Sequence, residues 1–344
     1  MSISYRWNLS DGYPVKNGYK VFSCFACGGG STMGYKKSGF EVLGCNEIDK
    51  NIIETYKLNH KPKFAFNMPI QEFSKKDKFP VELLNLDILD GSPPCSSFSM
   101  AGSREDAWGK EKKFKEGQVK QVLDTLFFDF ILLAKKLQPK IIISENVKGM
   151  LMGDAKEYFH KVMAGFEDAG YETNHYLLNS EKMGLPQRRE RVFFISIRKD
   201  IIEKLNGYPP LDMNFYEKRV TFEEATRSFW SEPRIKLTET GQKWWPLCKE
   251  GESFSTVTGG SLFNWIKVAR NKPTPTLPAS HSVIFHPVIP GQLNENEYKV
   301  CGSYPLDYKV TNGVDVKYLV GMSVPPLMIS KISEKIKINV LDKL

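Results

Sequence analysis

The sequence predicts an α/β protein: a mostly parallel sheet with helices on both faces, and a second, smaller domain rich in loops. Through residues 19–197, short apolar runs alternate with segments of helical periodicity, which is typical of parallel strands connected by helices. Regular periodicity is then lost, and tryptophans, lysines, arginines and glycines are interspersed instead. We therefore predict a larger domain over 1–197 and a smaller one over 198–323.

The first elements of the larger domain surround a glycine-rich turn. An apolar run predicts a strand at 19–25, and three consecutive glycines at 28–30 then lead into a helix at 31–38. A second strand at 41–45 and a second helix at 49–59 repeat this pattern. The turn thus lies where a strand passes into a helix.

The remaining elements continue the alternation. Apolar runs predict further strands at 84–89, 140–144, 171–178 and 191–197. Apolar residues spaced three and four apart predict helices at 119–137 and 156–168, ended by a proline and a glycine respectively. Residues 324–344 return to helical spacing, and we expect this last helix to pack back on the larger domain.

Composition restricts the class of protein. The 344 residues are 26% charged and 41% hydrophobic, as in ordinary globular proteins, and the formal net charge of +8 favours a polyanionic partner such as nucleic acid. No apolar run approaches the roughly 18 residues of a membrane span, and residues 1–11 lack the apolar core of a signal peptide. Six cysteines in a chain of this length do not indicate a disulfide framework, so we expect a reducing cytoplasm.

The glycine turn and a downstream acid predict a cofactor site. Backbone N–H groups at a strand-to-helix turn attract anionic ligand groups. Glu47, nineteen residues after Gly28, follows the second strand, a position from which a carboxylate commonly binds ribose hydroxyls. We interpret the pair as a site for a nucleoside-containing cofactor; the alternative is a tight turn beside a solvated glutamate. The spacing G-x-G-x-x-G is absent, which argues against NAD.

Cys24 and Cys27 have the spacing of a zinc or redox pair. No second cysteine pair and no histidine pair lies nearby in sequence to complete a tetrahedral site. We therefore interpret them as small residues around the turn, and expect no metal.

A cysteine and a glutamate predict covalent chemistry. Cys95 follows two prolines beyond the strand at 84–89, and Glu145 follows the strand at 140–144. Ligands of open α/β sheets bind at these carboxyl ends, so we predict a nucleophile and an acid there. The alternatives are a buried structural thiol and a strand-ending turn. Residues 96–120 are polar and contain several glycines, which predicts a mobile lid.

A run of charges precedes the last strand of the larger domain. Arg189 and Arg191 alternate there, and on a strand they would point to the same side, toward one site. A solvated charged segment is the alternative.

Taken together, these motifs resemble those of the cytosine-C5 DNA methyltransferases. The similar segments occur in the family's order and cover nearly the whole chain: 25–30, 46–49, 91–99, 145–147, 187–191, 272–277 and 321–326. The resemblance implies a Rossmann-like methyltransferase sheet that binds S-adenosylmethionine. It also implies that the region 198–269 recognises a specific sequence in double-stranded DNA.

The resemblance implies a mechanism on a cytosine flipped out of the duplex. Cys95 would add to C6 of the base, which makes C5 able to attack a methyl group. Glu145, protonated or sharing a proton, would hydrogen-bond N3 and the exocyclic amine. Arg189 would steady the carbonyl oxygen of the base, and Arg191 would support the site.

The resemblance also implies two sets of binding residues. The residues expected to contact the cofactor are Phe25, Ala26, Gly29, Gly30, Glu47, Ile48, Asn67, Met68, Pro94, Leu126, Met322 and Ser323. Those expected to contact DNA are Ser99, Gln187, Trp245 and Arg270. A monomer is the default for the family, and a cognate restriction endonuclease is a partner that the resemblance allows.

Three departures from the family pattern lie on the cofactor side. Cys27 stands where the family usually has glycine, Asn67 where it has aspartate, and Met322 where it has asparagine. They motivate one alternative, a catalytically silent relative that binds DNA. A tRNA cytosine-C5 methyltransferase is a second alternative, and a nicotinamide oxidoreductase is a third, disfavoured by the glycine spacing.

Overall fold

The computed structural model describes residues 4–94, 125–153 and 155–344. The chain forms two compact units. The sheet unit comprises Tyr13–Leu178, Glu190–Asn214 and Ile329–Leu344. The small unit comprises Met1–Gly12, Asn179–Arg189 and Phe215–Met328.

The sheet unit is built on seven strands in the order β3-β2-β1-β4-β5-β7-β6. The strands are β1 Lys20–Cys24, β2 Glu41–Asn46, β3 Phe64–Phe66, β4 Ile88–Gly91, β5 Ile141–Val147, β6 Tyr171–Asn179 and β7 Glu190–Arg198. Strands β1 to β5 pair in parallel, whereas β7 runs antiparallel to β5. The predicted α/β fold with a mostly parallel sheet is confirmed.

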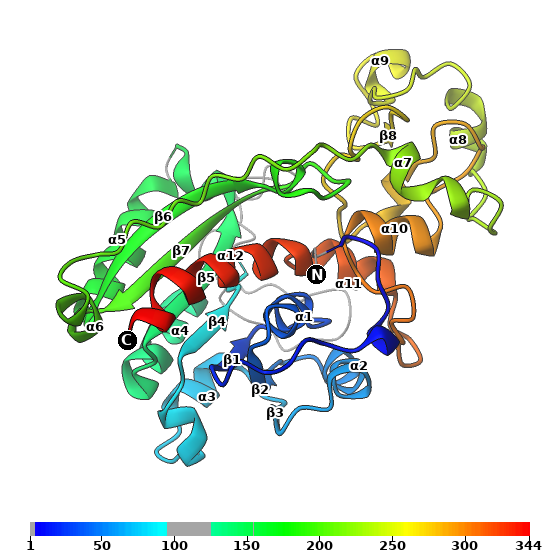
Figure 1. Ribbon diagram of the computed structural model, residues 1–344. Helices are drawn as coiled ribbons and strands as arrows, with labels where there is room; N and C mark the ends of the chain where they lie inside the picture. Colours follow the sequence, from blue (N-terminus) through cyan, green and yellow to red (C-terminus); the bar gives the residue numbers. More distant parts are fainter. Residues whose placement is uncertain (1–3, 95–124, 154) are drawn as a thin grey trace. The chain divides into compact units, whose positions relative to one another are not determined.

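Helices cover both faces of this sheet (Figure 1). They are α1 Gly30–Lys37, α2 Lys50–His60, α3 Ile70–Lys75, α4 Leu126–Leu137, α5 Ala155–Asp168, α6 Lys199–Lys204 and α12 Pro326–Asn339. Phe22 of β1 belongs to a large hydrophobic cluster that includes Phe73 of α3, Phe130 of α4 and Phe166 of α5. On the opposite face Tyr35 of α1 donates a hydrogen bond to Asp90 of β4, at 3.1 Å.

Helix α12 packs beside α1 through small polar side chains. Ser38, just after α1, donates through Oγ to the carbonyl oxygen of Ser330 at 2.8 Å. Ser333 Oγ lies 3.1 Å from Ser38 Oγ. The end of the chain is therefore attached to the sheet unit, more than 290 residues after its partner helix.

Three elements of the sheet unit were not predicted from the sequence. Strand β3 has three residues and helices α3 and α6 have six each, so none is long enough to show a periodic pattern. β3 is held at the edge of the sheet by Asn46, whose Nδ2 donates to the carbonyl oxygens of Phe66 and Met68 at 3.2 and 2.8 Å.

Gly44 allows β2 and β3 to approach closely, and this predicts a stability effect. Gly44 is paired with Phe64, and a Cβ at Gly44 would lie 1.9 Å from the Phe64 carbonyl oxygen. Because the obstacle is backbone, β3 would have to move. We expect Gly44→Ala to lower the free energy of unfolding by about 2–3 kcal/mol, measured by denaturant titration.

Gly165→Ala is the matched control for this variant. A Cβ at Gly165 meets the Cδ1 methyl of Ile131 at 3.1 Å, a side chain that can shift, and alanine suits the interior of α5 better than glycine. Unchanged stability of Gly44→Ala would contradict the close packing of β2 and β3.

The small unit has short helices and one two-stranded sheet. Its elements are α7 Phe222–Thr226, α8 Glu239–Trp244, α9 Ser255–Thr258, α10 Glu295–Cys301, α11 Val316–Met322, β8 Ile266–Lys267 and β9 Ile284–Phe285. No helix among these exceeds seven residues, which explains the missing periodicity. Capping defines α10 instead: Asn294 accepts from the Glu297 N–H at 2.9 Å, and Glu297 accepts from the Asn294 N–H at 2.8 Å.

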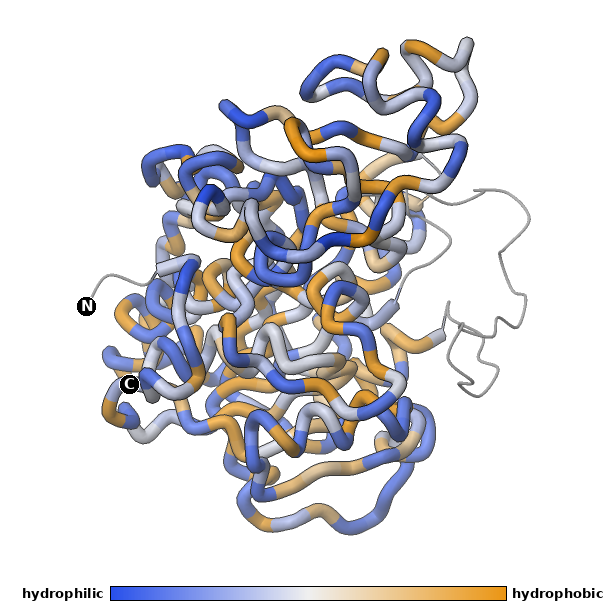
Figure 2. Tube along the Cα trace, turned by 90° about the vertical axis from the view of Figure 1, so that its right-hand side faces the viewer, coloured by the Kyte–Doolittle hydropathy of each residue, from blue (hydrophilic) through white to orange (hydrophobic). Residues whose placement is uncertain are grey.

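Short 3₁₀ helices complete the described chain at Leu9–Asp11, Val81–Leu84, Lys148–Leu151, Ser180–Met183, Arg227–Phe229, His281–Val283 and Leu341–Lys343. Hydrophobic and hydrophilic residues are interspersed along the trace (Figure 2). Among the described residues, no helix is both long enough and apolar enough to cross a membrane.

Candidate active site

The glycine turn after β1 has a strained backbone. Phe25, Cys27 and Gly29 all have positive φ angles, of 53°, 47° and 80°. Such a conformation is uncommon for residues with a side chain and costs of order 1–3 kcal/mol each. Hydrogen bonds hold it: the Ala26 N–H donates to the Asn46 carbonyl oxygen at 3.3 Å, and the Gly29 N–H to that of Ala26 at 2.8 Å. The Phe25 ring is half-buried beside Phe130, with centroids 6.3 Å apart.

His60, at the end of α2, packs under this turn. Its Nε2 lies 3.1 Å from the Gly28 carbonyl oxygen. Burial lowers the pKa of His60 to about 3, so the ring is neutral and Nε2–H donates to that oxygen. A Cβ at Gly29 would lie 2.2 Å from His60 Nε2, so position 29 requires glycine on grounds of space as well as φ.

Glu47 connects the end of β2 to the same turn. Its Oε2 accepts a hydrogen bond from the Cys27 N–H at 2.8 Å, and its Oε1 accepts from the Asp49 N–H at 3.0 Å. The residue is 7% exposed; burial raises the pKa of the carboxyl, and the backbone N–H groups oppose that rise. Each carboxylate oxygen retains acceptor capacity for a ligand hydroxyl.

Asn67 lies beside Glu47 and is oriented by the backbone. Its Nδ2 donates to the carbonyl oxygens of Glu47 and Ile48, both at 2.9 Å. With Nδ2 used in this way, the exposed amide presents Oδ1 as an acceptor. Ile48 and Met68 are half-buried next to it. Predicted cofactor residues from β1, β2 and β3 are thus brought to one end of the sheet.

Glu145 and Arg191 form an ion pair at this same end. Arg191 Nε lies 2.8 Å from Glu145 Oε1, and the two side chains are 15% and 12% exposed. Arg191 is opposite Val147 in the antiparallel register, which makes it a diagonal neighbour of Glu145 on the same face of the sheet. Burial lowers the pKa of Arg191, and the Glu145 carboxylate opposes that effect.

The segment leading toward Cys95 is fixed by the neighbour of Glu145. Asn146 Nδ2 donates to the carbonyl oxygen of Pro93 at 3.2 Å, which joins the end of β5 to the chain after β4. Pro94 is half-buried. Cys95, Ser99 and the predicted lid over 96–120 lie outside the described residues.

Two side chains lie deeper at this end. Asp90 of β4 is 3% exposed and accepts from Ser23 Oγ at 2.7 Å as well as from Tyr35. Burial raises the pKa of Asp90 to about 7, against the effect of these hydrogen bonds. Leu126, predicted to lie under the cofactor, is fully buried in the hydrophobic cluster of the sheet unit.

In the small unit, Gln187 and Arg189 hold together segments that are far apart in sequence. Gln187 Oε1 accepts from the Leu277 N–H at 3.2 Å, and its Nε2 donates to the Cys301 carbonyl oxygen at 3.0 Å. Arg189 donates to the carbonyl oxygens of Leu277 and Gly321, at 3.2 and 3.1 Å. Both residues are nearly fully buried. The predicted motifs at 187–191, 272–277 and 321–326 therefore meet.

The other predicted residues of the small unit are placed as follows. Met322 is 42% exposed, whereas Ser323 is buried with its hydroxyl 2.5 Å from that of Tyr304. Trp245 donates through Nε1 to the His286 carbonyl oxygen at 3.0 Å.

Two residues predicted to contact DNA, Trp245 and Arg270, each have a charged neighbour. Lys267 Nζ lies 3.7 Å from the centre of the Trp245 ring. Exposed Arg270 pairs with Glu250 at 3.0 Å. Across the described ranges, no group of three or more His, Cys, Asp or Glu residues is arranged to hold a metal ion.

Comparison with known proteins identifies the family. The model of the C-5 cytosine-specific DNA methylases matches residues 19–338, which is most of the chain. The chain belongs to this family. The match includes the glycine turn with Phe25, and Glu47 after β2. It also includes the segments that Gln187 and Arg189 hold together.

Similar methylases come from bacteria and phages. The chain is 38% identical over 185 residues to the type II methyltransferase M.FnuDI of Fusobacterium nucleatum, covering 53% of this chain and 48% of that protein. It is 29% identical over 334 residues to the type II methyltransferase M.Sau96I of Staphylococcus aureus, covering 89% and 73%. The chain thus spans about half the length of the former methylase and nearly three quarters of the latter.

Solved structures support the fold of this chain. A protein encoded within a prophage of E. coli superposes with a TM-score of 0.70 and 18% identity, covering 94% of this chain and 100% of its own. A DNMT2 variant from Spodoptera frugiperda superposes with a TM-score of 0.63 and 15% identity, covering 92% and 99%. At these identities the likeness concerns the fold alone.

Sequence reasoning missed three residues around the candidate active site. His60 ends a helix, and nothing in the sequence connects it to a turn more than thirty positions earlier. Asn46 was noticed only as part of a motif. Asp90 could have been found from the sequence, because an acid inside an otherwise apolar strand requires buried hydrogen-bond partners.

Proposed function

We propose that this methylase transfers a methyl group from S-adenosylmethionine to C5 of a cytosine within a specific sequence of double-stranded DNA. The observation that carries the proposal is the Glu145–Arg191 pair, 2.8 Å apart at the carboxyl end of the parallel strands. Asn146 joins that strand end to the residues just before Cys95. A nucleophile and a fixed carboxylate on neighbouring strand ends suit covalent activation of a base.

The residues of the sheet unit fit the proposed cofactor. Glycine at position 29 lets His60 pack directly against the turn, and His60 thereby supports the backbone conformation proposed to hold the cofactor. Glu47 would accept from ribose hydroxyls, and Asn67 Oδ1 would accept from an adenine amine. Phe25 would contact the cofactor through its half-buried ring. S-adenosylmethionine supplies an electrophilic methyl group when it is bound.

Further residues are proposed to complete this cofactor site. They are Ala26, Gly30, Ile48, Met68, Pro94, Leu126, Met322 and Ser323. Ala26 and Gly30 belong to the turn itself, and Ile48 and Met68 lie next to Asn67. Asn67 accepts through an amide oxygen where the family has a carboxylate, so the substitution retains an acceptor.

The chemistry starts with the thiolate of Cys95. Its sulfur would form a bond to C6 of the cytosine, and the electron pair of the C5=C6 bond would let C5 bond the methyl carbon, whose bond to the sulfonium sulfur breaks and leaves its electron pair on that sulfur. Glu145 would accept from the exocyclic amine and, when protonated, donate to N3, which neutralises charge on the ring. Loss of the C5 proton then returns an electron pair to the ring and expels the Cys95 thiolate.

Arg191 would position Glu145, and Arg189 would steady the carbonyl oxygen of the base. The contacts of Arg189 with Leu277 and Gly321 support a positioning role as well, since they fix its guanidinium. Gln187 would assist DNA binding by holding 272–277 in place, in line with its burial.

The small unit is proposed to recognise the DNA. Trp245 and Arg270 would contribute there, while Ser99 would contact DNA near the flipped base. Flipping makes the base accessible to the sheet unit at a cost of a few kcal/mol. We further propose that the larger domain of the sequence, 1–197, carries catalysis and 198–323 target recognition. A monomer in the cytoplasm, with or without a cognate restriction endonuclease, is part of the same proposal.

Bisulfite sequencing tests this function directly. Plasmid DNA from cells that express the chain is compared with DNA from cells that express Cys95→Ser. We expect 5-methylcytosine at one short sequence, present only with the unaltered chain. Unmodified DNA in both would contradict the proposal, and methyl transfer to purified tRNA, but not to duplex DNA, would establish the RNA alternative instead.

Glu47→Gln is expected to weaken cofactor binding by at least about tenfold. Glutamine presents N–H groups where two backbone N–H groups need acceptors, so it disturbs the turn as well as the ribose contact. Binding of S-adenosylhomocysteine, measured by calorimetry, checks the effect. Glu54→Gln, an exposed acid on α2 paired with Lys57, is the control. An equal loss of DNA binding and cofactor binding would refute a specific role.

A further inference from the structure

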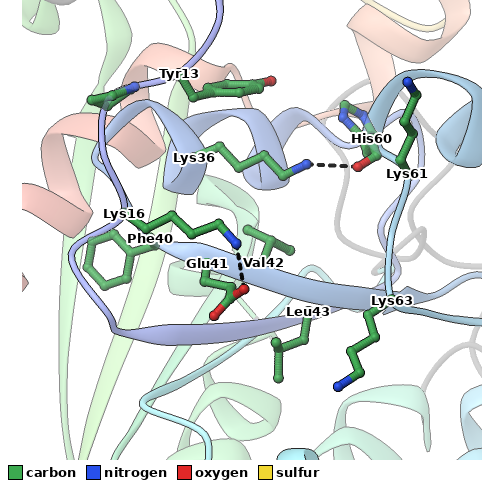
Figure 3. A pocket seen from close by; sticks show the side chains of 11 residues that line it. Tyr13, Lys16, Lys36, Phe40, Glu41, Val42, Leu43, His60, Lys61 and Lys63 are labelled. Atoms are coloured by element: carbon green, nitrogen blue, oxygen red, sulfur yellow. Dashed lines mark hydrogen bonds and ion pairs between the residues drawn. The ribbon is translucent and has the colours of Figure 1, made fainter.

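A cavity lies in the sheet unit, and His60 is the residue of the candidate active site that also lines it. It has a volume of about 510 Å³, within the size range of small-molecule sites. Its walls come from residues 13–16, the last turn of α1, the first residues of β2, the end of α2 and the start of β3 (Figure 3). No residue predicted for the cofactor or for DNA lines it.

Positive charge dominates the lining of this cavity. Lys16, Lys36, Lys61 and Lys63 contribute side chains, against one carboxylate, that of Glu41. Glu41 is paired with Lys16 at 2.6 Å, as Figure 3 shows. Lys63, at the rim, is paired at 2.5 Å with Glu82, which is outside the lining. Lys36 is therefore the half-buried ammonium that determines the character of the interior, whereas Lys61 is exposed.

Lys36 is the central group. Its ammonium donates one hydrogen bond, to the carbonyl oxygen of His60 at 2.9 Å (Figure 3). An ammonium has three N–H donors, and a carbonyl at a helix end neutralises it only in part. Tyr13 covers it from one side, with Nζ 5.6 Å from the ring centre. Burial, with Lys16 nearby, lowers the pKa of Lys36 to about 8.

We propose that this cavity binds a small phosphate-bearing anion, of the size of pyrophosphate or a nucleoside phosphate. Compact oxyanions match the point charges of lysines, and a multiply charged anion would compensate Lys36 together with exposed Lys61. The position at the start of β2, where no residue proposed for DNA lines the cavity, favours a free small molecule over a polymer backbone. The proposal does not depend on the methyltransferase reaction.

Lys36 connects the cavity to the glycine turn through His60. Lys36 contacts the backbone of His60, and the His60 ring contacts Gly28 in the glycine turn. An anion in the cavity would therefore act on the residue that supports this turn, without occupying the turn itself.

Calorimetric titration with sodium pyrophosphate tests the proposal. At pH 8 about half of the Lys36 side chains are neutral, and the bound anion favours the ammonium form. We therefore expect the unaltered chain to take up as much as about half a proton more than Lys36→Gln does, because the protons that pyrophosphate itself exchanges cancel in this difference; the uptake is read from two buffers of unequal ionisation enthalpy. At pH 6 the difference should vanish, because Lys36 is already protonated there.

Two variants and a control make the result specific. Lys36→Gln is expected to weaken pyrophosphate binding at least tenfold and to lack the additional uptake. Lys16→Gln, at a more exposed position, should weaken binding even if the first variant is unstable. Lys156→Gln, an exposed lysine on α5, should bind as the unaltered chain does. Equal affinity in all variants, or no binding at millimolar concentration, would overturn the proposal.

A duplex of about ten base pairs distinguishes the two sources of phosphate. If the duplex leaves bound pyrophosphate in place, the cavity is a site for a free anion. If it displaces pyrophosphate in proportion to its own binding, these lysines belong to a DNA surface and the proposal is wrong.

Discussion

Glu145→Gln is expected to reduce methyl transfer to duplex DNA by about 100-fold or more. Glutamine has the size of glutamate and its oxygen can still accept from Arg191, so the fold should be retained. It cannot deliver a proton to N3 of the base, and it removes the negative charge of a pair that is largely shielded from water. Single-turnover rates with saturating DNA and cofactor measure the loss at the chemical step.

Glu190→Gln serves as the control on the same edge of the sheet. Glu190 precedes Arg191 and pairs with Lys148 at 3.0 Å, but both side chains are about 40% exposed. Its substitution should change the rate less than about threefold. If Glu145→Gln retained a rate within threefold of the unaltered chain, the proposed role of this carboxylate would have to be abandoned.

Cys95→Ser is expected to abolish methyl transfer, with a loss of about 1000-fold or more, and to preserve DNA binding. A cysteine thiol with a pKa near 8.5 supplies a usable fraction of thiolate, whereas a serine hydroxyl does not ionise near neutral pH. Methyl transfer is measured as the radioactive methyl group incorporated into DNA retained on a filter. DNA binding is measured by fluorescence anisotropy. The two readouts separate chemistry from recognition.

Covalent trapping gives this variant an independent test. Fluorine at C5 of the target base cannot leave as a proton does, so the adduct with Cys95 should persist on a denaturing gel. We expect the adduct with the unaltered chain and with Cys248→Ser, a buried cysteine of the small unit, but not with Cys95→Ser. An adduct formed by Cys95→Ser would mean that another residue attacks the base.

The sequence predicted the sheet well because its strands are apolar runs that stop at recognisable residues. Strands β1, β2, β5, β6 and β7 each match the predicted segments to within a few residues. It did not predict that β7 runs antiparallel to β5, since direction is a property of the pairing and leaves no mark in a short apolar run. β3, with three residues, was beyond such reasoning.

For the candidate site too, some features could be predicted from the sequence and others could not. The positions of Glu47 and Glu145 at strand ends could be predicted, because polar residues directly follow buried runs. The pairing of Glu145 with Arg191 depends on the reversed direction of β7, which places the start of that strand next to the end of β5.

Long-range contacts explain why the position of Arg189 could not be predicted from the sequence. Arg189 and Arg191 were predicted to share a strand face, yet Arg189 precedes β7 and is held by carbonyl groups some ninety to one hundred and thirty residues away. Contacts of such sequence separation are set by tertiary structure. The chemical roles of all these residues stay predictions.

The division of the chain has a consequence for how such proteins can be recombined. The small unit takes one long continuous segment, Phe215–Met328, and two short ones, Met1–Gly12 and Asn179–Arg189. The segment that ends at Arg189 contacts the long one through backbone groups of Leu277, Cys301 and Gly321. Gly321 is required for space, because a Cβ there would lie 2.4 Å from the backbone of Pro278, and position 277 must keep its N–H. At other positions, side chains over 215–328 can diverge, or be exchanged as a block between relatives, while the same glutamine and arginine still bind the incoming segment.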